Sequence, residues 1–104
     1  MNPSKIDFDA LVWEEPAAGV RCKAVSRAGR RLRLVEFTSE FVEEGWCVLG
    51  HVGYVLAGEV EIAFAGRTEV YKAGDGIFIE GGEAERHRAR VFGETARLLL
   101  VEDV

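Results

Sequence analysis

The side chains of this sequence best suited to chemistry are two thiols and two imidazoles, two of which lie four positions apart. Cys47 and His51 form this close pair, and Cys22 and His87 are the remaining cysteine and histidine. A thiolate and an imidazole both bind divalent metals, and a thiol beside an imidazole can act as a nucleophile. Each thiol has the commoner alternative of being a small buried apolar group.

A nucleophilic role for Cys47 needs more than His51. It needs a third group that orients the imidazole and a site for a developing oxyanion, and the sequence displays neither. It also contains no Walker loop, no G-x-S-x-G elbow, no C-x-x-C pair and no dinucleotide-binding fingerprint. Two cysteines are too few for a disulfide framework, so we expect free thiols, with a single bridge as the alternative.

Charged and aromatic residues add candidates for ligand binding. Arg31 and Arg33 share one face of an expected strand, and if that face looks inward they would bind a carboxylate or phosphate of a small ligand. If it looks outward, they are simply solvated. Glu85 could ligate a metal or act as a general base, although its neighbours alternate in charge as exposed loops do. Tyr54 and Phe78 are expected in the core or in a pocket wall.

Composition excludes several partners. The net charge is −5 and basic residues are scattered among acidic ones, so no basic face is available for nucleic acid. No apolar run approaches the roughly 20 residues that span a bilayer, and residues 1–10 lack the apolar core of an export signal. We therefore expect a cytoplasmic protein with no membrane partner.

Strands must position these residues, because short runs rich in Val, Ile, Leu, Phe and Tyr alternate with glycine-containing turns. The expected strands are Val20–Val25, Arg31–Phe37, Trp46–Leu49, Gly53–Leu56, Glu59–Ala65, Thr68–Tyr71, Gly76–Ile79, Glu85–Val91 and Ala96–Val101. Glycine turns such as Ala57-Gly58 and Phe92-Gly93-Glu94 predict hairpins between them, and such short links join antiparallel strands. An all-β sandwich or barrel follows, as a single domain over 1–104 with an N-terminal arm over 1–18 and the barrel over 19–104.

Two segments resemble the conserved motifs of cupins. Gly53–Glu59, GYVLAGE, is similar to the end of the first cupin motif, and Ala73–Gly82, AGDGIFIEGG, to the start of the second. The resemblance implies a double-stranded β-helix, the RmlC-like jelly-roll β-barrel.

The resemblance also implies where a metal would bind. In cupins, the first motif supplies two histidines and a glutamate and the second supplies one more histidine, and these positions fall here on Gly45, Cys47, His51 and Glu85. His87 stands two places beyond the last, on the same strand face. We therefore predict a site made of Cys47, His51 and His87 with Glu85 or water, for zinc first and for iron, nickel or copper next. The alternative is a metal-free barrel.

Three hypotheses of function follow. The first is a small-molecule cupin that binds a divalent metal and could be a metal-dependent enzyme of unidentified substrate. The second is a metal-free metabolite-binding or sensing module, and the third is a small partner subunit. The resemblance further implies a homodimer, which we expect to bury apolar residues of the arm. These residues are Phe8, Leu11, Val12 and Trp13.

Overall fold

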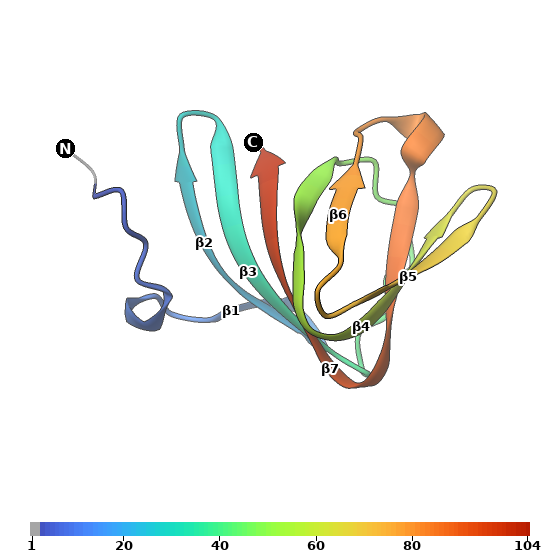
Figure 1. Ribbon diagram of the computed structural model, residues 1–104, viewed down its shortest axis with the longest axis horizontal. Coiled ribbons are helices and arrows are strands. Elements are labelled where there is room, and N and C mark those ends of the chain that lie inside the picture. The colour runs from blue at the N-terminus through green and yellow to red at the C-terminus, as the bar shows by residue number, and fades with distance from the viewer. Residues whose placement is uncertain (1–2) are drawn as a thin grey trace.

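The computed structural model describes residues 3–104, which form seven β-strands and two short 3-10 helices (Figure 1). The strands are β1 (Glu14–Ala17), β2 (Val20–Arg27), β3 (Arg30–Thr38), β4 (His51–Phe64), β5 (Thr68–Lys72), β6 (Gly76–Ile79) and β7 (His87–Asp103). The 3-10 helices are η1 (Phe8–Ala10) and η2 (Glu83–Glu85). Within residues 3–104, no helix has the length and apolar content needed to cross a membrane. The first two residues of the expected arm lie outside this described part.

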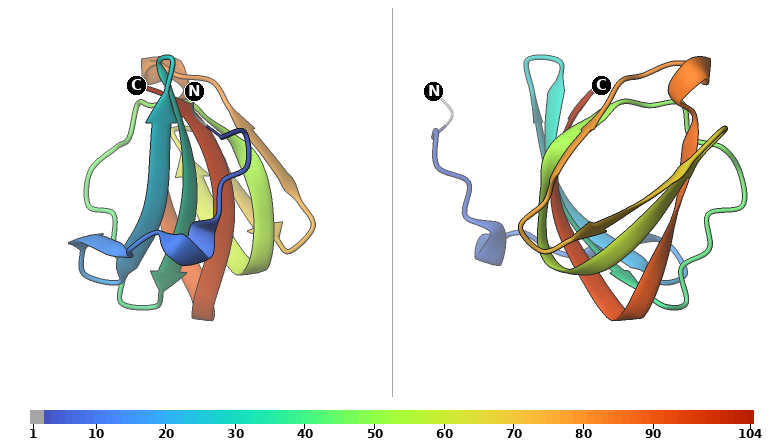
Figure 2. Two further views of the ribbon diagram at one scale, coloured as in Figure 1. Left: turned by 90° about the vertical axis from the view of Figure 1, so that its left-hand side faces the viewer. Right: turned by 45° about the vertical axis from the view of Figure 1, so that its right-hand side comes forward.

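All strand pairs are antiparallel, as the short links predicted. The strands follow the order β1-β2-β3-β7-β4-β5, and β6 pairs with β4. The sheet curls so that two layers face each other (Figure 2). One layer contains β3, the first part of β4 and the last part of β7, and the other contains β5 with the remaining parts of β4 and β7.

Two long bent strands replace two of the predicted hairpins. Gly58 lies inside β4 and Gly93 lies inside β7, and both have positive φ values, of 75° and 76°. A side chain at position 58 would place its Cβ 2.1 Å from the carbonyl oxygen of Thr95, so only glycine fits there. Each glycine therefore bends a strand from one layer to the other, and the hairpins expected at Ala57-Gly58 and Phe92-Gly93-Glu94 were wrong.

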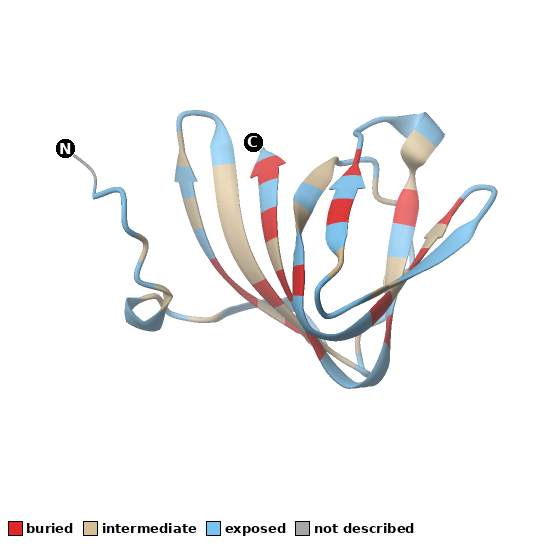
Figure 3. Cartoon of the chain, viewed as in Figure 1, coloured by how far each residue is buried: buried red, intermediate tan, exposed pale blue. Residues whose placement is uncertain are grey.

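The apolar core lies between the layers. Val35, Val55 and Val60 are fully buried, and buried residues alternate with exposed ones along β4, β6 and β7 (Figure 3). This alternation follows from the period of two in a strand. It places Ile77 and Ile79 of β6 inside and leaves the residue between them outside.

The N-terminal stretch is tied to β2. β1 pairs with β2, so part of the predicted arm is a strand of the sheet. Lys23 of β2 donates from Nζ to the carbonyl oxygen of Phe8 at 2.7 Å, and the guanidinium of Arg21 lies 4.1 Å from the ring of Trp13. Val12 remains 82% exposed.

Candidate metal and ligand site

Cys47, His51 and His87 come together at one end of the space between the layers. Their ligand atoms all lie within 4.8 Å of one another. Cys47 is in the loop before β4, where only an isolated bridge forms instead of the expected strand Trp46–Leu49. In that bridge, the Cys47 amide donates to the His87 carbonyl at 2.7 Å and the His87 amide donates back at 2.9 Å. His51 and His87 are the first residues of β4 and β7.

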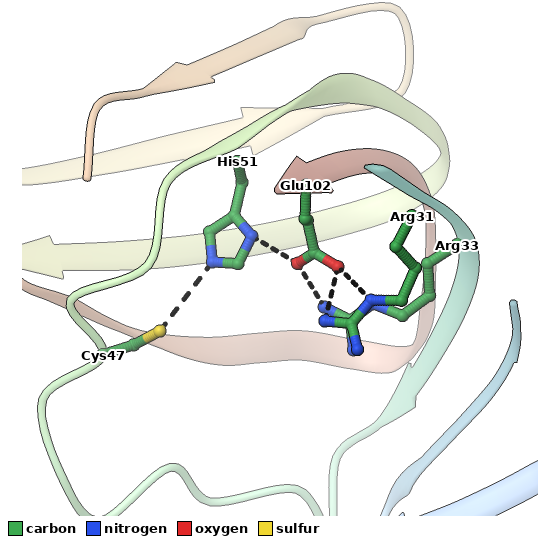
Figure 4. Close-up of polar contacts among 5 residues, drawn as sticks. All are labelled: Arg31, Arg33, Cys47, His51 and Glu102. Carbon is green, nitrogen blue, oxygen red and sulfur yellow. Dashed lines mark hydrogen bonds and ion pairs between the residues drawn. The ribbon is translucent and has the colours of Figure 1, made fainter. Parts of the chain in front are cut away.

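Both imidazoles use the same nitrogen, Nδ1, to contact an oxygen atom of the protein. Nδ1 of His51 lies 2.6 Å from Oε2 of Glu102, and Nδ1 of His87 lies 3.0 Å from the backbone oxygen of Glu85. Since both oxygens can only accept, each Nδ1 carries the hydrogen and each Nε2 presents its lone pair. Nε2 of His51 points toward Sγ of Cys47 (Figure 4), and the two atoms are 3.9 Å apart. Nε2 of His87 is buried and has no hydrogen-bond partner within residues 3–104.

These observations fit a metal centre. The donor set is one thiol sulfur and two imidazole nitrogens, which suits zinc or a related transition metal. The Nδ1 atoms of the two rings are held by a carboxylate and a backbone carbonyl, as is usual for histidine ligands of metals. The unpartnered Nε2 of His87 is a buried polar atom that a metal would satisfy.

Glu102 is the central residue that the sequence did not reveal. It lies on β7 opposite Arg31 of β3 and is only 3% exposed. Its Oε1 accepts from Arg31 at 2.9 Å, and its Oε2 accepts from Arg33 at 2.7 Å and from His51 (Figure 4). Burial alone would raise the pKa of Glu102, but the hydrogen bond from His51 and the charge of Arg33 outweigh it and lower the pKa to about 2. Glu102 also supplies the orienting group that a Cys47–His51 nucleophile would need.

The polar face of β3 looks inward. Arg31 and Arg33 line the same cavity as Cys47, His51 and His87. The sequence left this orientation open, and the structure places both guanidinium groups inside. Nε of Arg33 is buried without a hydrogen-bond partner among the described residues.

The cavity has a volume of about 340 Å³. Beyond the polar groups, its wall is mostly apolar, with the largest share from β4, β6 and β7 and further residues from β1, β2, β3 and the loop before β4. The main apolar residues are Val60, Ile62, Ile77, Ile79, Leu98 and Leu100. Pockets that bind small molecules have volumes and mostly apolar linings of this kind.

Three predicted site residues lie outside this cavity. Glu85 belongs to η2 and not to the strand, and its carboxylate pairs with Arg67 at 3.0 Å, so only its backbone oxygen reaches His87. Tyr54 and Phe78 lie on the outer face, 47% and 77% exposed, because their strand neighbours take the inward positions. Their expected place in the core or pocket wall is thereby corrected.

Comparison in sequence gives one family. The family model described as "Cupin domain" matches residues 48–102, which include His51, His87 and Glu102. Cys47 and the two cavity arginines precede the matched segment. No curated protein matches the chain.

Comparison in structure gives many similar proteins. An RmlC-like cupin from Shewanella frigidimarina has a TM-score of 0.75 at 16% identity, with 98% of this chain and 91% of that chain covered. KdgF from Halomonas sp. has a TM-score of 0.79 at 19% identity, with 97% and 95% covered. The polyketide cyclase RemF from Streptomyces resistomycificus has a TM-score of 0.75 at 24% identity, with 98% and 80% covered. These likenesses confirm the predicted jelly-roll β-barrel.

Proposed function

This chain belongs to the cupin family, and on that premise we propose that it binds a small molecule beside a divalent metal ion held by Cys47, His51 and His87. Family membership supports the binding of a small molecule. The metal and any reaction at it are our inference from the cluster of donors.

One observation carries the proposal. His87 is 3% exposed, its Nε2 has no partner within residues 3–104, and its ring offers a ligand atom within 4.8 Å of those of Cys47 and His51. A buried polar group left unpaired costs about 1–3 kcal/mol. A metal ion shared by the three atoms removes that cost, which favours a metal over an apolar ligand at this end of the cavity.

The donor set favours zinc first, with iron or nickel as weaker candidates. Three protein ligands leave a fourth position for water or substrate, and a bound metal supplies there a Lewis acid or an activated water. The protein residues fix the ligands: Glu102 holds the Nδ1 hydrogen of His51, and the backbone oxygen of Glu85 holds that of His87. Apolar side chains line most of the remainder of the cavity.

The test is the metal content of protein purified without chelator or metal-affinity tag. We expect close to one zinc per chain by elemental analysis. Cys47→Ser, His51→Ala and His87→Ala should each lower the content sharply, because removal of one ligand opens the site to exchange. Cys22→Ser is the matched control, since Cys22 is buried in the core away from the cluster, and it should keep its metal.

Two results would count against the proposal. Metal retained in all three ligand variants places the ion elsewhere. Absence of metal from the parent protein favours the alternative function, a metal-free module that binds or senses a metabolite, for which the apolar cavity is the supporting observation.

We also propose that two copies pair through an outer apolar patch, defined as Val52, Tyr54, Leu56, Phe78 and Val101. All five are exposed, and the pairings Val52–Phe78 and Val52–Val101 place three of them side by side on neighbouring strands. An exposed apolar cluster of this kind marks an interface, and a two-fold axis would bury the patch against its own copy. The predicted burial of the arm and the cytoplasmic location likewise remain proposals.

A further inference from the structure

Arg31 and Arg33 differ from the other arginines within residues 3–104, because only these two line the cavity. Arg21 and Arg97 pair with Glu36 on the outer face, and Arg67 pairs with Glu69 and Glu85 at the surface. The side chains of Arg31 and Arg33 are 31% and 20% exposed. They are therefore partly withdrawn from water in a pocket wall.

Glu102 accepts hydrogen bonds from only some of the N–H groups of Arg31 and Arg33. It accepts from Nε and one terminal nitrogen of Arg31 and from one terminal nitrogen of Arg33. Each guanidinium has five N–H groups in a fixed fork, so several donors remain, including the buried Nε of Arg33. The two arginines carry two positive charges and Glu102 carries one negative charge, so the group has a net charge of one positive unit. A single negative charge on a ligand would balance it.

The other charge in the cavity wall does not fill this role. Glu43 lies in the loop beside the opposite layer, where its Oε1 accepts from the Ala89 amide at 2.8 Å. The arginines lie on β3 of the first layer, whereas the Glu43 contact is made to β7 in the second layer. The two arginines and the Cys47–His51–His87 cluster are therefore neighbours, because one oxygen of Glu102 contacts both Arg33 and His51, and the remainder of the cavity wall is mostly apolar.

From this arrangement we infer that the ligand is a small organic carboxylate with an apolar body. Its carboxylate binds Arg31 and Arg33 beside Glu102 and close to the cluster, and its body fills the apolar remainder of the cavity. A carboxylate carries the single charge that the pair lacks, whereas a phosphate monoester carries about −1.5 to −2 at neutral pH. A sugar or nucleotide would leave hydroxyls unpaired against the apolar wall. The inference names the ligand of the cavity in the proposed function, and its charged contact does not require the metal.

The test compares hexanoate with hexanamide, which has the same length and no charge. Binding to the full chain is measured by calorimetric or NMR titration, both after zinc loading and after chelator treatment. We expect hexanoate to bind at least about tenfold more tightly than hexanamide in both states, as loss of a charge-assisted contact predicts. Hexyl phosphate should bind more weakly than hexanoate.

Arg31→Gln should weaken hexanoate binding by about tenfold and leave hexanamide unchanged, because Arg33 still pairs with Glu102. Arg31→Lys, which keeps the charge but loses the fork, should show a smaller loss and guards against a folding defect. Arg97→Gln is the matched control on the outer face and should bind as the parent does.

Equal affinity for hexanoate and hexanamide overturns the inference, as does hexanoate binding that neither Arg31 variant changes. Tighter binding of hexyl phosphate overturns the choice of carboxylate. The metal proposal can fail independently of the carboxylate site. If the protein takes up no metal but still binds hexanoate selectively, the carboxylate site stands and the metal proposal fails. If the protein takes up metal but does not prefer hexanoate, the carboxylate site is refuted.

Discussion

The layer formed by β3, β4 and β7 has two regions of opposite character. Near its middle, Val35 and Val55 point into the core while Glu36 on the outer face pairs with Arg21 and Arg97. Toward the site, the arrangement reverses: Arg31 and Glu102 lie inside, and the apolar patch lies outside. The strands keep their alternation throughout, so only the choice of side chain changes.

The middle of the layer has the side-chain distribution that stabilises a fold, whereas the end near the site departs from it. An apolar interior with a charged exterior is what folding alone requires. A charged interior is expensive unless every charge is paired, and an apolar exterior is costly unless something covers it. The reversal therefore marks both the ligand cavity and the proposed interface, on the two faces of the same strands.

The largest effect should come from removing the carboxylate at the reversed end. Glu102→Gln leaves two guanidinium groups without their counter-charge, and we expect it to lower the free energy of unfolding by about 3 kcal/mol in urea denaturation. The same change in the other region, Glu36→Gln, should cost about 1 kcal/mol or less, because the side chains of Arg21 and Arg97 are 40% and 45% exposed and water screens their charges. Equal losses would remove the contrast between the regions.

Acid should act on the same carboxylate. Because the pKa of Glu102 is lowered to about 2 from 4.5, its contribution is complete above the unfolded value and disappears as the pH falls toward 2. The parent should lose about 3 kcal/mol between roughly pH 5 and pH 2 through this group. Subtracting the pH profile of Glu102→Gln isolates that part, and superimposable profiles would contradict the assignment.

Substitutions in the outer patch should have the smallest effect on the unfolding free energy of one chain and the largest effect on dimer formation. Phe78→Ser should change the unfolding free energy of the monomer by about 0.5 kcal/mol or less, since the side chain is 77% exposed. Light scattering at micromolar concentration should nevertheless shift from dimer to monomer. Val70→Ser, on exposed β5 outside the patch, is the control and should leave the dimer intact. A monomeric parent protein would refute the pairing.

Sequence reasoning found the strands but not their extent. The alternation and glycine turns predicted an antiparallel all-β fold, yet Gly58 and Gly93 bend β4 and β7 instead of closing hairpins. Both outcomes use the same positive φ at one glycine, so local sequence cannot distinguish them. The choice depends on distant pairing, such as that between β4 and β7.

The sequence predicted only part of the site, because the rest of it also depends on distant strand pairing. The cupin resemblance identified Cys47, His51 and His87, which the structure brings together. Glu102 was missed because the expected strand ended one residue earlier and an acidic residue there suggests solvent. Its position in register with Leu98 and Leu100, two inward residues of β7, was the available signal. Glu85 was misplaced because a 3-10 turn, which periodicity does not predict, precedes β7.

The contacts that hold Glu102 also have a consequence for the order of folding. They join residues far apart along the chain, with separations of 71 positions to Arg31 and 51 to His51. Closing loops of this length costs entropy before any contact is gained, and folds dominated by such contacts form slowly. Until β7 has paired with both β3 and β4, the arginines, the imidazole and the carboxylate have no common location. The site is therefore completed late in folding, with the pairing of the last strand.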